Sequence, residues 1–284
     1  MADGCAACHR THTAQAGKLL KQAQTGLCYS CHGTSGAGAS TDVQGGNGYA
    51  GAGTGIRGAA TGALRGGGFE TARLDSGNTT SLASGIVPVR ATGIAVTSAH
   101  TVDGATGTAW GNGALSTTAN PGTAINLTCG SCHDPHGNGN YRILRPIPTS
   151  SGAAGTGITE ALTTVKTYTT VNYWAVSDVN TAGYITNVSA WCSTCHTRYL
   201  AGSGSSSTDS TDAIFRYRHT SNAANEGGPS CIKCHVSHGS NAAMSGTASA
   251  AAGLVNPGTT TNTITSSKLL RIDNRGVCQQ CHNK

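Results

Sequence analysis

The sequence predicts a chain that is mostly coil, with a few short α-helices and minor short β-strands. Leu, Ile, Val and Phe together make up 41 of 284 residues, or 14 %, and chains below about 20 % rarely bury enough side-chain surface to fold alone. Gly contributes a further 41 residues, yet the net charge is only +6, unlike that of most disordered chains. All 12 cysteines fall into one repeated pattern. We therefore expect a compact chain whose interior is not built from its own side chains.

Charge and hydropathy exclude two classes of function. The 18 Lys and Arg residues are scattered along the chain, and they form no basic patch of the kind that binds nucleic acid. The sequence has no apolar run of about 18 residues or more, which is the length that a membrane-spanning helix requires. We expect neither a nucleic-acid partner nor a membrane span.

Local patterns place the few regular elements along the chain. Short helices are expected at 13–24 (TAQAGKLLKQAQ), around 186–200 and around 210–219, where the last one ends at His219. Alternating apolar patches predict short strands within 85–96 (GIVPVRATGIAV) and at 122–128 (GTAINLT). Residues 33–128 contain Gly-rich runs that prefer loops, and they carry no cysteine motif. We expect residues 1–284 to form a single unit with 33–128 as a Gly/Ala/Thr-rich insertion.

Every cysteine belongs to a C-x-x-C-H motif, and six such motifs occur. This motif is typical of c-type haem attachment, in which two thiols bind one haem and the adjacent histidine becomes the proximal iron ligand. Zinc sites or redox dithiols would not require a histidine after every second cysteine. The predicted attachment residues are Cys5, Cys8, Cys28, Cys31, Cys129, Cys132, Cys192, Cys195, Cys231, Cys234, Cys278 and Cys281, and the proximal ligands are His9, His32, His133, His196, His235 and His282.

Six covalent haem c groups would also supply the missing interior, because porphyrin faces are large and mostly apolar. The prediction is therefore a haem-cored multihaem cytochrome c. The insertion at 33–128 is expected to fold over neighbouring haems and to deliver His100.

Five histidines remain for the second axial positions: His12, His100, His136, His219 and His238. Three of them occur at the same offset, in CHRTH, CHDPH and CHVSH. Residues i and i+3 of a helical turn lie on one face, about 5–6 Å apart, so their rings cannot bind one iron from opposite sides. We expect the second histidine of each such motif to serve a neighbouring haem.

Eleven histidines cannot fill the 12 axial positions of six irons. Met244 is the first candidate for the remaining position, because His/Met ligation is common in cytochromes. An ordinary loop methionine in SNAAMSG is an equally supported interpretation of Met244. Met1 or the N-terminal amine could instead ligate the first haem, and a five-coordinate iron is the third possibility.

Export is expected because covalent haem attachment normally takes place outside the cytoplasm. No signal peptide is visible before Cys5, so we interpret the chain as the mature product, exported through the periplasm to the extracellular space or the cell surface. The first motif begins at Cys5 and the last ends at His282. Haems near both ends could meet counterparts on identical subunits, and a contact between unlike surfaces that does not close gives a filament.

The six motifs, the C-x-x-C-H-x-x-H variant at 5–12, 129–136 and 231–238, and the Gly/Ser/Thr-rich spacers resemble the extracellular multihaem c-type cytochromes that form nanowires. The nearest pattern is that of six-haem, OmcS-type filament cytochromes. The resemblance implies one continuous chain of haems, with parallel-stacked and T-shaped pairs alternating, and head-to-tail polymerisation in a helical filament. It also implies that His12 ligates a haem of the adjacent subunit. Those filaments are fully bis-histidine, whereas only 11 histidines occur here.

The expected function is long-range electron transfer to redox partners and extracellular acceptors rather than catalysis. Six-coordinate irons cannot bind a substrate without losing a ligand. One alternative is a discrete periplasmic or cell-surface electron shuttle without a polymer. Another is a multihaem reductase, whose active haem would be the one that is short of a histidine.

Overall fold

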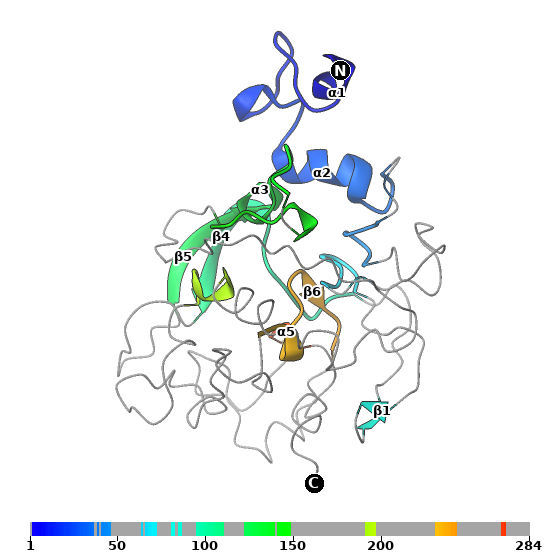
Figure 1. Cartoon of the computed structure of the whole chain (residues 1–284), viewed down its shortest axis with the longest axis vertical. Helices are drawn as coiled ribbons and strands as arrows, with labels where there is room; N and C mark the ends of the chain where they lie inside the picture. The colour runs from blue at the N-terminus through cyan, green and yellow to red at the C-terminus, as the bar shows by residue number, and fades with distance from the viewer. Residues whose placement is uncertain are drawn as a thin grey trace.

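The computed structural model describes residues 2–36, 39, 41–46, 64, 66–72, 81–82, 85–86, 95–110, 122–139, 141–148, 191–196, 231–242 and 268–270. Within these residues the chain has short helices, three two-stranded sheets and extensive coil. The predicted fold class, mostly coil with few helices and minor strands, is confirmed. Figure 1 shows α1 at one end of the described part, α2 and α3 next to each other, and α5 with β6 further from that end.

The N-terminal segment contains α1 (Ala2–Ala6), the 3-10 turn η1 (Gly17–Leu19) and α2 (Gln24–His32). The prediction of a helix at 13–24 is wrong. Lys18 and Leu19 have φ angles of 61° and 59°, in the left-handed region, because their carbonyl oxygens accept hydrogen bonds from the His9 ring and the Arg10 amide. A helix through these residues would turn both carbonyls away from those donors. Helix α2 therefore begins only at Gln24.

The longest sheet pairs β4 (Asp103–Trp110) with β5 (Gly122–Thr128) in antiparallel register. The predicted strand at 122–128 is confirmed. Strand β4 was not predicted, because its sequence DGATGTAW lacks an apolar alternation. Strand β5 runs directly into α3 (Cys129–Cys132), and the Thr128 amide donates to the Ser131 hydroxyl over 3.0 Å. The sheet therefore holds the start of the third cysteine motif.

Two small sheets lie elsewhere: β1 (Ser81–Leu82) pairs with β2 (Gly85–Ile86), and β3 (Ser98–Ala99) pairs with β6 (Gly239–Ser240). Strand β2 begins the predicted strand region 85–96, and residues 87–94 lie outside the described residues. The β3–β6 pair joins the 33–128 segment to the fifth motif, because β6 follows α5 (Cys231–Cys234) closely in the chain. Residues 191–193 form a helical turn within the predicted helix 186–200, whose other parts, like 210–219, are not described.

The described core is small and partly polar. Its buried apolar side chains are Leu64, Ala72, Ala109, Ile125, Val236 and Ala242, and its largest fully buried side chains are Asn241, Thr194 and Ser240. Such a set supplies little of the burial that usually drives folding. Among the described residues, no helix has the length and apolar character needed to span a membrane.

Candidate functional site

The cysteine motifs share one local geometry. In four of them the histidine amide donates to the carbonyl of the first cysteine, at 2.8 Å for His9, 3.0 Å for His133, 3.1 Å for His196 and 2.9 Å for His235. The motif at 28–32 lies at the end of helix α2, and the motif at 278–282 lies outside the described residues. One turn of helix brings residues i and i+3 to the same face, so both thiols of a motif can reach one ligand. The ten described cysteines form no disulfide with one another.

Three of the described proximal histidine rings are held by their Nδ1 atoms. His9 Nδ1 lies 2.9 Å from the Lys18 carbonyl oxygen, His133 Nδ1 lies 2.8 Å from that of Arg142, and His235 Nδ1 lies 2.9 Å from that of Lys268. A carbonyl oxygen can only accept, so each Nδ1 carries the proton. The lone pair then resides on Nε2, which is available to a metal. The His32 ring differs, since its Nδ1 lies 3.1 Å from the Thr41 hydroxyl.

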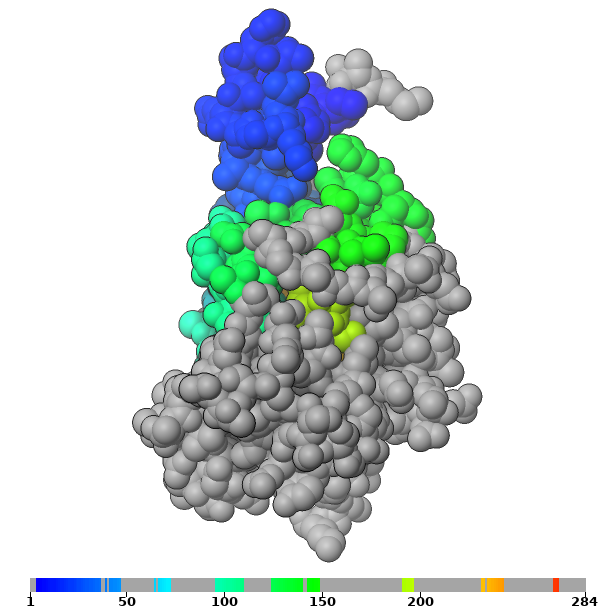
Figure 2. All heavy atoms as spheres, turned by 90° about the vertical axis from the view of Figure 1, so that its left-hand side faces the viewer, coloured from blue at the N-terminus to red at the C-terminus, as the bar shows by residue number. Residues whose placement is uncertain are grey.

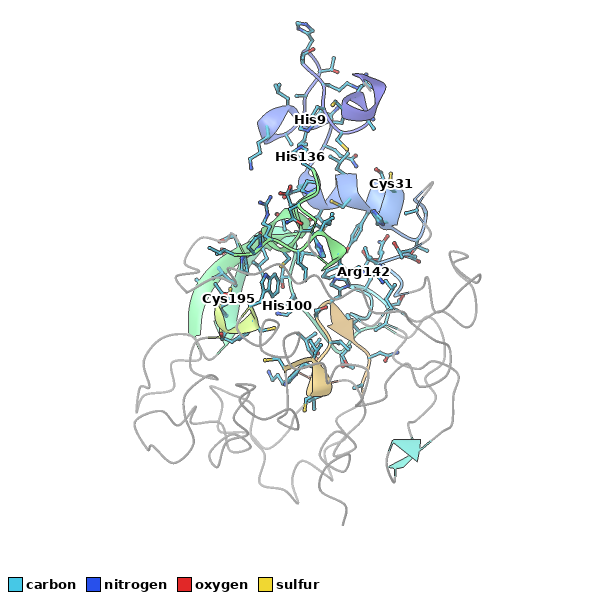
Figure 3. All side chains as sticks on the ribbon, in the orientation of Figure 1. His9, Cys31, His100, His136, Arg142 and Cys195 are labelled. Carbon is cyan, nitrogen blue, oxygen red and sulfur yellow. The ribbon has the colours of Figure 1, made fainter. Side chains whose placement is uncertain are left out.

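Three pairs of histidine rings lie at nearly the same separation, with 11°, 54° and 60° between their planes. The ring centres of His9 and His136 are 6.2 Å apart, those of His100 and His196 are 6.3 Å apart, and those of His133 and His238 are 6.4 Å apart. Each pair joins a C-x-x-C-H histidine to a histidine from a distant part of the sequence. Figure 3 shows His9 and His136 where the N-terminal segment meets the segment that follows α3.

This separation fits two ligands on opposite sides of one metal ion. With a metal–nitrogen bond of about 2.0 Å and a ring centre about 1.2 Å behind each nitrogen, two trans imidazoles lie roughly 6.4 Å apart. The described residues contain no group of three or more His, Cys, Asp or Glu arranged to hold a bare ion. A haem iron needs only two axial protein ligands because the porphyrin supplies the other four. The donor set therefore fits a haem.

The expected helical geometry of His133 and His136 is wrong, although the two rings do face different partners. Helix α3 ends at Cys132, and His133 is extended, with φ −112° and ψ 145°. The His133 ring lies opposite that of His238, and the His136 ring lies opposite that of His9. The chain bends between the two histidines, so a helical face does not relate them.

His238 is positioned by the Gly-rich segment at 66–68. Its amide donates to the Gly66 carbonyl over 2.7 Å, and its Nδ1 lies 3.1 Å from the Gly67 carbonyl. The ring also stacks on Phe69, with centres 4.6 Å apart. Burial lowers the pKa of His238 to about 4. The imidazole is therefore neutral near pH 7, which is the form that binds metals.

Burial also lowers the pKa of His100, His133 and His235. His100 donates from Nδ1 to the Ser237 carbonyl over 2.7 Å, and its amide donates to the His238 carbonyl over 2.9 Å. These bonds attach residue 100, which belongs to the 33–128 segment, to the residues that directly follow the fifth motif.

Cysteines of successive motifs lie close together. Cys28 is hydrogen bonded to Cys129, and this bond together with burial raises the pKa of Cys28, whereas it lowers the pKa of Cys129 to about 7. A hydrogen bond with Cys231, and burial, raise the pKa of Cys192. These contacts join the second motif to the third and the fourth to the fifth.

Weaker charge interactions complete the series. Cys8 interacts with Cys28, which links the first motif to the second. Burial, and to a lesser extent the nearby Cys195, raise the pKa of Cys132 to about 12. Because Cys195 belongs to the fourth motif, the third and fourth motifs lie close together. The first five motifs are therefore spatial neighbours in the order of the sequence.

The remaining predicted site residues are less informative. His12 is exposed in the bend that follows the first motif. Cys278, Cys281, His282, His219 and Met244 lie outside the described residues.

Sequence reasoning missed the carbonyl partners of the proximal histidines, although the sequence carries a signal for them. They begin three similar tetrapeptides, KLLK at 18–21, RILR at 142–145 and KLLR at 268–271. The first two follow His9 and His133 at the same spacing of nine residues.

Comparison with known families finds the model of the doubled CXXCH motif at residues 1–37. Comparisons with curated proteins and with solved structures found no match. The matched region contains the first two motifs, the His9 ring contact and helix α2. The C-x-x-C-H motifs indicate covalently bound haem c. Together with the doubled motif, they support a multihaem c-type cytochrome that acts in electron transfer.

Proposed function

We propose that the chain binds six covalent haems, conducts electrons through them over long distances, and polymerises head to tail into an extracellular conductive filament. The observation that carries this proposal is the series of neighbouring motifs among the five that the structure describes. Interactions of Cys28 with Cys129 and of Cys192 with Cys231 support this, because they bring the second motif next to the third and the fourth next to the fifth.

The ring pairs support a ligand assignment for three of the irons. His9 and His136 hold the first, His133 and His238 the third, and His196 and His100 the fourth. Three proximal histidines then remain, at His32, His235 and His282, and three predicted donors remain, at His12, His219 and Met244. An iron with two such axial ligands supplies one-electron transfer and has no open position for a substrate.

The same pairs suggest how copies of the chain join. His238, from the fifth motif, faces the histidine of the third motif, and His136, from the third motif, faces that of the first. By the same pattern, His12, the second histidine of the first motif, pairs with a proximal histidine that belongs to another copy of the chain. His12 is exposed, and the N-terminal segment projects beyond the rest of the described residues (Figure 2). His12 therefore ligates a haem of a neighbouring copy, and this contact between unlike surfaces extends into a filament.

Imaging of the native extracellular material, together with intact mass measurement, tests the proposal. The expected result is helical filaments whose haem series crosses subunit boundaries, and a polypeptide that carries six haem masses. Strictly monomeric protein with six haems would favour a discrete electron shuttle. A high-spin ferric signal from one haem would favour a reductase, whereas fewer than six haems would overturn the assignment itself.

A further inference from the structure

Strained backbone occurs at one recurring place in the described residues. All six non-glycine residues with positive φ form three adjacent pairs: Lys18 and Leu19, Arg142 and Ile143, and Lys268 and Leu269. Their φ angles range from 51° to 62°. L-residues visit this region rarely and usually singly, because the Cβ atom crowds the following carbonyl. Each pair begins one of the tetrapeptides KLLK, RILR and KLLR, which we call clamp segments.

Each clamp segment binds a proximal histidine through the same bonds. The first residue accepts from the histidine Nδ1, at 2.9, 2.8 and 2.9 Å in chain order. The second residue accepts from the amide that follows the histidine, at 2.8 Å in all three cases. In the first two clamps the fourth residue, Lys21 or Arg145, also donates its amide to the second cysteine of the motif, at 3.0 and 2.9 Å.

The strain is explained by these bonds. Two successive left-handed residues turn two successive carbonyls towards the same side, where the histidine ring and the next amide lie. An extended backbone would instead point successive carbonyls to opposite sides, and a right-handed helical turn would direct them along its own axis to its following amides. Unfavourable conformations persist where the surroundings over-determine them, and they gather at functional sites. The feature common to all three sites is the proximal histidine.

The clamp segments also reveal a repeated two-motif unit. The sequences KLLKQAQTGLCYSCH at 18–32 and KLLRIDNRGVCQQCH at 268–282 align without a gap, with ten residues from the first lysine to the cysteine. The unit at 129–196 has RILR at the same distance from its histidine as the first unit, but a longer spacer before CSTCH. The unit at 231–282 instead has its longer spacer before KLLR. Only the first unit lacks both spacers, and it is the one that matches the doubled motif.

We propose that the three clamp segments are positioning elements that fix the Nδ1–H tautomer of His9, His133 and His235, and thereby lower the reduction potentials of the haems attached at these motifs. The inference rests on haem attachment as proposed above. An imidazole that donates to a carbonyl is a more basic ligand, and a basic ligand stabilises the oxidised iron. The haem at His32, whose ring lies by the Thr41 hydroxyl, is not clamped in this way.

Substitutions at Lys18 test the inference through the backbone. Proline cannot adopt φ 61°, so Lys18→Pro removes the carbonyl from His9. Glycine adopts this angle without strain, so Lys18→Gly retains the bond. In a spectroelectrochemical titration of haem-loaded protein, Lys18→Pro should shift the part of the absorbance change that comes from one haem to a higher potential. Lys18→Gly should leave all reduction potentials unchanged and should raise the midpoint of unfolding. Identical titrations for Lys18→Pro and Lys18→Gly would overturn the inference.

A measurement on the unsubstituted protein tests the inference even if the Lys18→Pro variant does not fold and acquire its haems. In reduced, ¹⁵N-histidine-labelled protein, the Nδ1–H protons of His9, His133 and His235 should exchange with solvent more slowly than that of His32. Equal exchange at all four rings would overturn the inference even if the haems are present. Absence of haem masses on the polypeptide would instead refute the proposed function, so the two failures are distinguishable.

Discussion

Replacement of His136 by alanine tests whether this histidine is an iron ligand or an ordinary surface residue. The His136 side chain is 78 % exposed, and its nearest charged contact is Asp134, 3.8 Å from Nδ1. Substitutions at such positions usually change the free energy of unfolding by less than about 0.5 kcal/mol. If His136 were an ordinary surface residue, His136→Ala should therefore change neither the stability nor the haems appreciably.

The expected effect on the iron is much larger. The His136 ring lies 6.2 Å from that of His9 and almost parallel to it, with 11° between the planes. Removal of His136 should leave the iron at His9 with one axial ligand. Among six haems, about one sixth of the ferric signal should then change from low spin to high spin.

Low-temperature electron paramagnetic resonance of the ferric protein measures this fraction directly. Asp134→Asn is the matched control, because it removes the charge beside His136 and retains the ring, so its spectrum should remain entirely low spin. His136→Met should restore six-coordination and raise the potential of that haem. A fully low-spin His136→Ala protein with an unchanged haem content would refute the pairing of His9 with His136.

Three further outcomes are expected. His12→Ala should abolish filaments seen by electron microscopy while the haem mass per chain stays the same, and intact filaments would exclude ligation between copies. Gly67 has φ 72°, and a Cβ there would collide with a backbone oxygen of β6, so Gly67→Ala should lower the free energy of unfolding by about 3 kcal/mol or more. Gly104 has φ 85° but its nearest neighbour is 3.8 Å away, so Gly104→Ala should lower the free energy of unfolding by only about 1 kcal/mol. Equal losses in denaturant titrations would contradict the close approach at Gly67. Thr41→Val should change the potential of the haem at His32, whereas Thr41→Ser, which keeps the hydroxyl 3.1 Å from the ring, should not.

Much of the local structure could be predicted from the sequence. The low apolar content and the many glycines predicted a coil-rich chain, which the structure confirms, and the core of the described residues is small. The strand at 122–128 was predicted from its own alternation. Such features depend on residues that are adjacent in the chain, and so the sequence is enough to specify them.

The partners of these elements could not be predicted in the same way. Strand β4 shows no alternation, and it is a strand because β5 pairs with it. The segment 13–24 has helical propensity, yet Lys18 and Leu19 are left-handed because donors from His9 and Arg10 fix their carbonyls. In both cases contacts between separate segments outweigh a weak local preference.

The sequence by itself determined how many C-x-x-C-H motifs the chain carries and which histidine adjoins each cysteine pair, because both follow from consecutive residues. Only the tertiary structure decided that His9 faces His136, that His133 faces His238 and that His196 faces His100. The partners in these pairs are far apart along the chain, and their separation is set by the clamp segments, the Gly-rich segment at 66–68 and the β3–β6 pair. Which two rings become neighbours depends on the path of the folded backbone between them. The spacing of histidines in the sequence does not specify that path.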